Sequence, residues 1–158
     1  MRKLLCTAPF VAFLLSFQTV AADLAGQATV IDGDTIEIHG QRIRLHGIDA
    51  PESAQLCRDA AGKSYACGKV AAFALADHIG RRTVDCRDTG GRTYKRIVAV
   101  CSIAGADLSR WMVQQGQAVA YRRYSLAYVE DEQAAQAAGL GVWRGEFVMP
   151  WDWRKGVR

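Results

Sequence analysis

Several features that often decide a protein's class are missing from this sequence. The 158 residues contain no internal repeat and no low-complexity tract, so nothing indicates a repeat or fibrous protein. After residue 22 no segment is apolar enough to cross a membrane. Three scattered histidines show no metal-ligand spacing, and 20 basic against 16 acidic residues leave a net charge of only +4. Charge alone therefore permits a polyanionic partner but does not indicate one.

What the chain does have is enough apolar material for one core, preceded by a distinctive N-terminus. Arg2 and Lys3 precede an apolar stretch that ends in Ala21-Ala22. This order predicts a secretory signal over residues 1–22, cleaved after Ala22. A membrane anchor is the less favoured alternative, because an interrupted stretch of about 17 residues is short for a span. We expect one domain over 23–158 with a short tail from about residue 144. That domain would be secreted or periplasmic, monomeric, and without stable membrane association.

Four cysteines remain after residue 22, and an even number in an exported chain favours disulfides. We favour Cys57–Cys67, which brackets one loop, and Cys86–Cys101, which joins two segments that resemble neighbouring strands. Free buried thiols suit a cytosolic protein better. A zinc site is also less favoured, because the close Cys-x-x-Cys spacing is missing.

Alternating and helical patterns follow one another along the chain in an order typical of an α+β fold. Short strands with strong turns suggest a small barrel, with helices packed on one side. The order fits a five-stranded OB-type barrel with three α-helices. Strands are expected near residues 29–31, 35–39, 42–45, 83–87 and 96–102, and helices at 67–79, 107–115 and 126–138. The end of the chain, around Trp151-Asp152-Trp153-Arg154, is expected to fold back over hydrophobic surface or to fray; extension of a substrate groove is the alternative.

Carboxylates gather in two turns, Asp32-Gly33-Asp34 and Asp49-Ala50-Pro51-Glu52. Carboxylates held close together repel one another, and a hard cation such as calcium or magnesium, which takes oxygen ligands, relieves that repulsion. The alternative is a pair of ordinary acidic turns, since Asp, Gly and Pro are common there.

Two arginines complete a possible phosphate site. Arg44 lies on the strand that leads into Asp49, and Arg96 opens a later strand. Guanidinium groups bind phosphate oxygens in a bidentate manner and stay charged, so arginines beside a metal suit a reacting phosphodiester. Two arginines lie between Tyr121 and Tyr124, and aromatic rings interleaved with positive charge suit stacked bases and a strand backbone. An amphipathic loop is the alternative explanation.

Five motifs in this order resemble the staphylococcal nuclease family. They run from about Ala28 to Trp143, nearly the whole chain after the predicted signal. The motifs are Asp32-Gly33-Asp34-Thr35, Arg44 to Glu52, Tyr94 to Ala99, Gly116 to Tyr121, and Gly139 to Trp143.

The resemblance implies a role for each matching residue. Asp34 and Asp49 would bind calcium through their carboxylates, and Ala50 through its backbone carbonyl. Glu52 would hold or activate the attacking water, and Arg44 and Arg96 would bind the phosphate. Asp32 and Thr35 would support the metal site from behind its ligands. Tyr94 and Tyr121 would line the nucleotide pocket.

The resemblance also implies an activity: a calcium-dependent nuclease that cleaves DNA and RNA with little sequence preference and leaves 3′-phosphate ends. Calcium is favoured over magnesium because the ligands are carboxylates and a carbonyl. Lys95 departs from the family's best-known member, which has a glycine there. Two alternatives stay open: a barrel that binds single strands without cutting them, and a structural protein of the cell envelope. A module that only binds would not need all of Asp34, Arg44, Asp49, Glu52 and Arg96.

Overall fold

The computed structural model describes residues 23–158, so the signal predicted over 1–22 lies outside the described residues. Its main element is a mixed sheet of seven strands, hydrogen-bonded in the order β1-β8-β9-β4-β3-β2, with β10 also paired to β9. All of these pairs are antiparallel except β4 with β9. The strands are Asp23–Gln27 (β1), Thr29–Asp32 (β2), Thr35–Ile38 (β3), Gln41–Leu45 (β4), Thr83–Thr93 (β8), Arg96–Ile103 (β9) and Ala106–Asp107 (β10).

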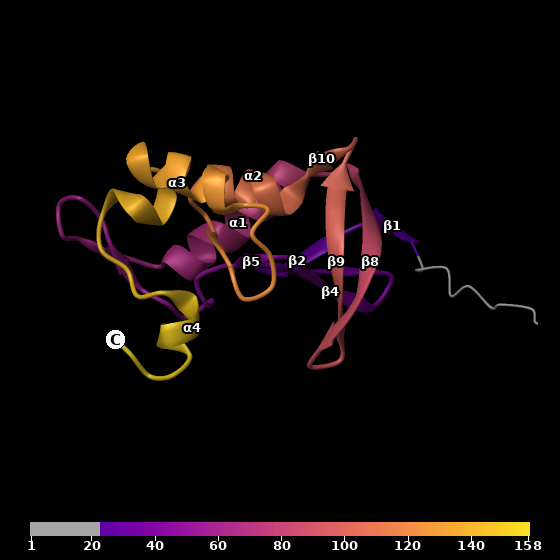
Figure 1. Ribbon diagram of the computed structural model, residues 1–158, viewed down its shortest axis with the longest axis horizontal. Helices are drawn as coiled ribbons and strands as arrows, with labels where there is room; N and C mark the ends of the chain where they lie inside the picture. The colour runs from indigo at the N-terminus through magenta and orange to yellow at the C-terminus, as the bar shows by residue number, and fades with distance from the viewer. Residues whose placement is uncertain (1–22) are drawn as a thin grey trace, which may run out of the picture.

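Helices cover one side of this sheet. Figure 1 shows three of them gathered beside the strands, with a fourth, α4, at the lower edge near the C-terminus. The helices are Cys67–Ile79 (α1), Leu108–Gln114 (α2), Val129–Ala137 (α3), the 3-10 helix Gly141–Arg144 (η1) and Pro150–Trp153 (α4). No helix within 23–158 has both the length and the apolar character needed to span a bilayer.

Two short strand pairs lie outside the main sheet. Ile48–Asp49 (β5) pairs with Val119–Ala120 (β11), and Cys57–Arg58 (β6) pairs with Ser64–Tyr65 (β7). The first pair matters most for function, because it anchors the segment that carries Asp49 to the rest of the domain.

The core forms where the sheet meets α1 and α2, and it follows the period of each element. The apolar residues of the β3–β4 hairpin, including Ile36, Ile38 and Ile43, alternate along their strands and are buried in one cluster with Leu75 of α1 and Met112 of α2. At roughly 1.5–3 kcal/mol for each large apolar side chain removed from water, this layer supplies most of the driving force for folding.

The fold class is α+β as expected, but two details of the predicted barrel differ. The hydrogen-bonded path among residues 23–158 runs through six strands, with β10 paired to β9 beside it, and leaves β1 and β2 as open ends, so the closed five-stranded barrel is not confirmed. Four α-helices are present in this part of the chain instead of three. Strand β1 has no alternating hydrophobic pattern and is defined by pairing with β8, while α4 is a single turn, too short for a helical period.

Both expected disulfides, Cys57–Cys67 and Cys86–Cys101, are confirmed. Cys86 and Cys101 face each other across β8 and β9, in direct register, and belong to the main core. Cys57 and Cys67 form a second, smaller cluster with Val142. The zinc and free-thiol alternatives for these cysteines are therefore excluded.

Candidate active site

The turn between β2 and β3 brings Gly33 close to Ala71 of α1 and to Ala50, beside the carboxylate of Asp34. A side chain at Gly33 would overlap Ala50 and Ala71, so only glycine lets this turn approach so closely. The Asp34 backbone N–H donates to Asp32 Oδ1 at 3.0 Å. Asp32 therefore fixes the turn that presents the Asp34 carboxylate.

Arg44 joins the two acidic turns. Its Nη1 contacts Asp34 Oδ1, and its Nη2 donates to Asp49 Oδ1 at 2.7 Å and to the Ile48 carbonyl at 3.2 Å. The Ala50 N–H donates to Asp34 Oδ2 at 2.8 Å. Asp34 and Asp49 are 2% and 0% exposed, so the guanidinium compensates two carboxylates that have almost no water.

Burial and neighbouring charges shift the pKa values of both Asp34 and Arg44. Burial raises the pKa of Asp34 to about 8, although Arg44 opposes the shift. Burial alone would lower the pKa of Arg44, but Asp34 and Asp49 outweigh it and the net pKa is raised. Burial therefore outweighs the stabilisation that Arg44 gives to the Asp34 carboxylate, and a bound cation would add to that stabilisation.

Arg96 reaches the same centre from β9. Its Nη1 donates to Thr35 Oγ1 at 2.9 Å, and the Thr35 hydroxyl donates to Asp34 Oδ1 at 3.2 Å. Thr35 thus connects the second arginine to the first carboxylate, and Arg96 makes no ion pair of its own within residues 23–158.

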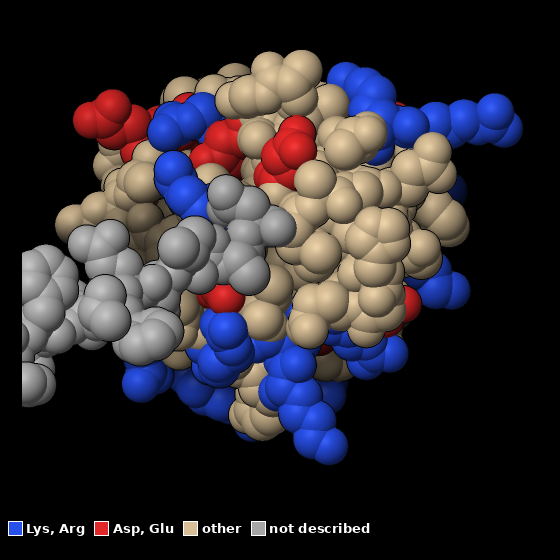
Figure 2. All heavy atoms as spheres, turned by 90° about the vertical axis from the view of Figure 1, so that its right-hand side faces the viewer, with Lys and Arg blue, Asp and Glu red and all other residues tan. Residues whose placement is uncertain are grey.

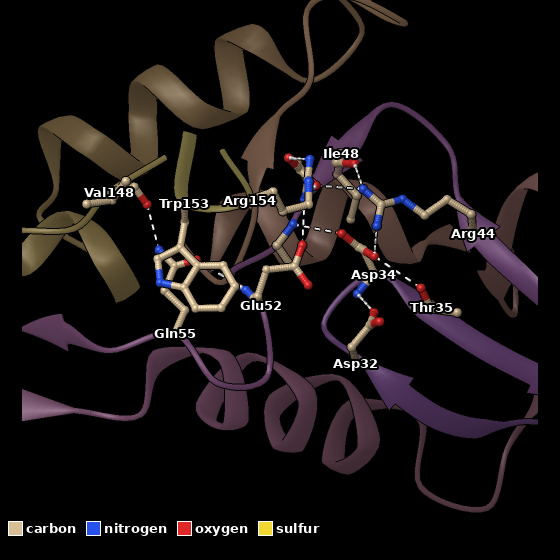
Figure 3. A network of polar contacts seen from close by, with 12 residues as sticks. Asp32, Asp34, Thr35, Arg44, Ile48, Glu52, Gln55, Val148, Trp153 and Arg154 are labelled. Carbon is tan, nitrogen blue, oxygen red and sulfur yellow. Dashed lines mark hydrogen bonds and ion pairs between the residues drawn. The ribbon is translucent and has the colours of Figure 1, made fainter. Parts of the chain in front are cut away.

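Glu52 approaches from the other side, and its main partner comes from the end of the chain. Arg154 Nη1 donates to Glu52 Oε1 at 2.6 Å, and the same guanidinium binds both oxygens of Asp49 at 3.0 and 2.8 Å. Figure 3 shows the two arginines meeting the acids from opposite directions. Nothing in the sequence pointed to Arg154 except the aromatic and basic residues around it, because this contact joins residues 102 positions apart in the chain.

Arg44, Glu52, Arg96 and Arg154 line one cleft of about 620 Å³, and the buried Asp34 and Asp49 contact the arginines of this lining. Tyr94 and Tyr121 both line it, and Tyr94 is 92% exposed at the tip of the β8–β9 hairpin. Tyr121 packs edge-on against Tyr124 and stacks on Trp151 of the C-terminal segment. The charged residues that line the cleft are Asp32, Arg44, Glu52, Arg92, Arg96 and Arg154.

Every residue predicted for the site therefore lies in or beside one cleft. The expected metal ligands are Asp34, Asp49 and the carbonyl of Ala50. Among residues 23–158 no group of three or more His, Cys, Asp or Glu side chains is arranged to hold a metal ion, so the site offers two carboxylates joined by Arg44. Carboxylate and carbonyl oxygens are hard donors, and the buried Asp34 carboxylate has a raised pKa that a divalent cation would lower. The residues present therefore fit a divalent cation.

Comparison with known proteins identifies the family to which the chain is similar. The family model described as staphylococcal nuclease homologue matches residues 42–145. The chain is 40% identical over 139 residues to the succinoglycan biosynthesis protein ExoI of Rhizobium meliloti (strain 1021), covering 85% of this chain and 73% of that protein. It is 33% identical over 153 residues to a micrococcal nuclease of Shigella flexneri, with 85% and 82% covered. An uncharacterized endonuclease of Haemophilus influenzae is 30% identical over 163 residues, with 98% and 86% covered.

In this α+β domain, a glutamate and several arginines line one open cleft beside two buried aspartates. Such a cleft suits the binding of an anionic substrate. With the family match over most of its length, the chain belongs to the staphylococcal nuclease family. The matched region includes Arg44, Asp49, Glu52 and Arg96 but not Arg154.

Proposed function

We propose that this protein is a secreted or periplasmic, calcium-dependent nuclease. It hydrolyses phosphodiester bonds of DNA and RNA with little sequence preference and leaves 3′-phosphate ends. One observation carries the proposal: Glu52, Arg44 and Arg96 line one open cleft, and Arg44 joins that cleft to the buried carboxylates of Asp34 and Asp49. The relatives named as nucleases support the same activity.

In this proposal Arg44 and Arg96 bind the oxygens of the scissile phosphate. A phosphodiester under attack gains negative charge on those oxygens, and fixed guanidinium groups stabilise that charge more than they stabilise the substrate. The basic surface supports a polyanionic substrate. Figure 2 shows lysine and arginine side chains gathered along the lower edge of one face, the edge toward which the tip of the β8–β9 hairpin points in Figure 1.

Glu52 accepts a proton from the attacking water, whose oxygen forms a new bond to phosphorus while the phosphorus–O5′ bond breaks. The O5′ oxygen takes up a proton from solvent and leaves as a 5′-hydroxyl, and the phosphate stays on the 3′ side. The Glu52 side chain is 32% exposed at the cleft, so water can reach it. Asp34, Asp49 and the Ala50 carbonyl would hold the calcium ion, which supplies charge stabilisation at a phosphoryl oxygen when bound. Tyr94, exposed at the hairpin tip, offers a face for a base, and Tyr121 lines the same cleft while stacked on Trp151. Stacking on aromatic faces tolerates any sequence.

The proposed location rests on two features. Both disulfides suit an oxidising compartment, and the first 22 residues have the composition of a secretory signal. We propose that the active form is a monomer beginning at Asp23.

The test is cleavage of single- and double-stranded DNA and RNA by residues 23–158. Each substrate is offered with calcium, with magnesium, and with a calcium chelator, and the product ends are analysed for 3′-phosphate. Glu52→Gln is expected to lower the rate by at least about a hundredfold, as removal of a general base does. Glu130→Gln, the same change at an exposed position of α3, serves as the matched control and should retain full activity.

Cleavage that requires calcium and is lost in Glu52→Gln would support the enzyme and its cofactor together. Binding of nucleic acid without cleavage would favour the single-strand-binding alternative. Activity that persists in the chelator or in the variant would contradict the assigned site.

A further inference from the structure

The C-terminal segment beyond the family match is built onto the site at three points. Trp151 stacks on Tyr121 with ring centroids 5.4 Å apart and an interplanar angle of 11°. Gln55, fully buried, donates its side-chain N–H to the Val148 carbonyl at 2.6 Å. Arg154, just after α4, makes the third contact at Asp49 and Glu52. A segment held at three points has a defined position over the cleft.

The C-terminal segment contacts Glu52 directly through Arg154, and it contacts the Glu52 backbone indirectly through Gln55. The Glu52 N–H donates to Gln55 Oε1 at 3.2 Å, and the other end of the same amide binds Val148. The carboxylate is fixed by Arg154, which at the same time grips both oxygens of Asp49. Glu52 is therefore tied to Asp49, a predicted metal ligand, through one rigid guanidinium.

The contact leaves one carboxylate oxygen of Glu52 available. Oε1 accepts the hydrogen bond from Arg154, and Oε2 accepts none from the residues that the structure describes. Figure 3 shows Oε2 directed away from Arg154. Without the arginine, a partly exposed glutamate has three rotatable bonds and many accessible positions.

We propose that Arg154 is a positioning residue of the nuclease site: it fixes the Glu52 carboxylate relative to Asp49, with one oxygen held and the other directed to the attacking water. The inference rests on the proposed function and adds to it a residue outside the family match. A base displaced by about 1 Å loses much of its effect, so the consequence falls on the rate of the chemical step.

The experiment compares kcat and KM of wild type, Arg154→Ala, Arg154→Lys and Lys155→Ala with saturating calcium and one DNA substrate. Arg154→Ala is expected to lower kcat about 10–100-fold, as loss of an orienting partner does. KM should change by less than about twofold, because Arg154 acts on Glu52 and not on the substrate. Arg154→Lys keeps the charge without the planar fork and should lie in between. Lys155, exposed and paired with Asp152, provides the control and should match wild type.

Two further measurements separate positioning from a structural role. Thermal unfolding of each variant establishes that it is folded at the assay temperature. Arg154→Ala is then added to Glu52→Gln; a residue that acts through Glu52 removes nothing more from the residual rate in that background.

An unchanged kcat in Arg154→Ala would overturn the inference, as would an equal loss of rate in the Glu52→Gln background. A raised KM with unchanged kcat would also overturn it, since Arg154 would then bind the substrate directly. An inactive wild-type protein would overturn the proposed function first and this inference with it.

Discussion

Arg44 is the residue on which the buried centre of the site depends. Its guanidinium contacts Asp34 and Asp49 together, and both carboxylates are removed from water. Removing Arg44 leaves the buried Asp34 carboxylate without its ion-pair partner, while Asp49 keeps Arg154. We therefore expect Arg44→Ala to lower the free energy of unfolding by about 3–5 kcal/mol, measured by urea denaturation at pH 8 in the presence of a chelator.

Arg96→Ala is the matched comparison for this change. Arg96 donates to the neutral hydroxyl of Thr35, so its loss should cost only about 1 kcal/mol. Equal losses for the two variants would mean that Asp34 and Asp49 do not depend on Arg44.

Lys95 occupies a backbone conformation that suits glycine. Tyr94 and Lys95 form the two-residue turn between the paired Thr93 and Arg96, with φ angles of 45° and 67°. A left-handed conformation costs an L-residue about 1–2 kcal/mol, and glycine avoids this cost but loses more entropy on folding. Lys95→Gly should raise the free energy of unfolding by about 0.5–1 kcal/mol, as followed by thermal unfolding.

The control is Lys69→Gly, the same substitution in the first turn of α1. There the backbone is helical, and the change should destabilise by about 1 kcal/mol. Two losses of similar size would show that the turn carries no strain at Lys95.

At the residue scale, the sequence was enough to predict most of the residues that the structure brings together at the cleft. Asp34, Arg44, Asp49 and Glu52 stand in two short motifs whose local turns hold them near one another. Arg154 was beyond such reasoning, because only the packing of the C-terminal segment brings it to Glu52.

At the scale of elements, α2 and α3 meet through one carboxylate. Asp107 is the N-cap of α2: its Oδ1 accepts the Arg110 N–H at 3.1 Å, and its Oδ2 accepts the hydroxyl of Tyr128 at 2.9 Å. Burial raises the pKa of Tyr128 to about 12, and the nearby charge of Asp107 adds to the shift. The folded protein thus keeps its phenol proton at a pH where the unfolded chain loses it.

This shift predicts the alkaline limb of stability. The contribution of Tyr128 is complete below about pH 10, the ordinary tyrosine value, and is lost as pH rises toward about 12. Tyr128→Phe should cost about 1 kcal/mol at neutral pH and give a shallower fall in melting temperature between pH 9 and 11. A slope identical to that of wild type would contradict this assignment.

Elements with a clear period were predicted from the sequence, and elements defined by contacts were not. The expected helix at residues 67–79 is confirmed with those bounds as α1, which has a long apolar side and ends before Gly80. Strand β1 and helix α4 were missed because pairing with β8 and packing on Tyr121 define them. The sheet's open path likewise depends on which strands pair, which periodicity does not encode.

Across the whole molecule, the two disulfides lie in different hydrophobic clusters, one in the main core and one beside the C-terminal segment. Cys86–Cys101 lies in the main core between β8 and β9. Cys57–Cys67 lies in the second cluster, where Trp143 and Phe147 also pack. Next to Cys57, the backbone of Arg58 pairs with Glu146, which leads into α4. The Cys57–Cys67 bridge therefore anchors the segment that carries Arg154.

Replacing each pair by alanine should separate stability from activity. Both double variants are expected to lose about 2–4 kcal/mol of stability, because each bridge restricts the unfolded chain. At a temperature where both are folded, Cys86→Ala/Cys101→Ala should keep the kcat of wild type. Cys57→Ala/Cys67→Ala should lose rate, because a loosened C-terminal segment no longer holds Arg154 against Glu52. Cleavage kinetics beside melting curves decide the point: equal rates in the two variants would mean that this bridge does not support the position of Arg154.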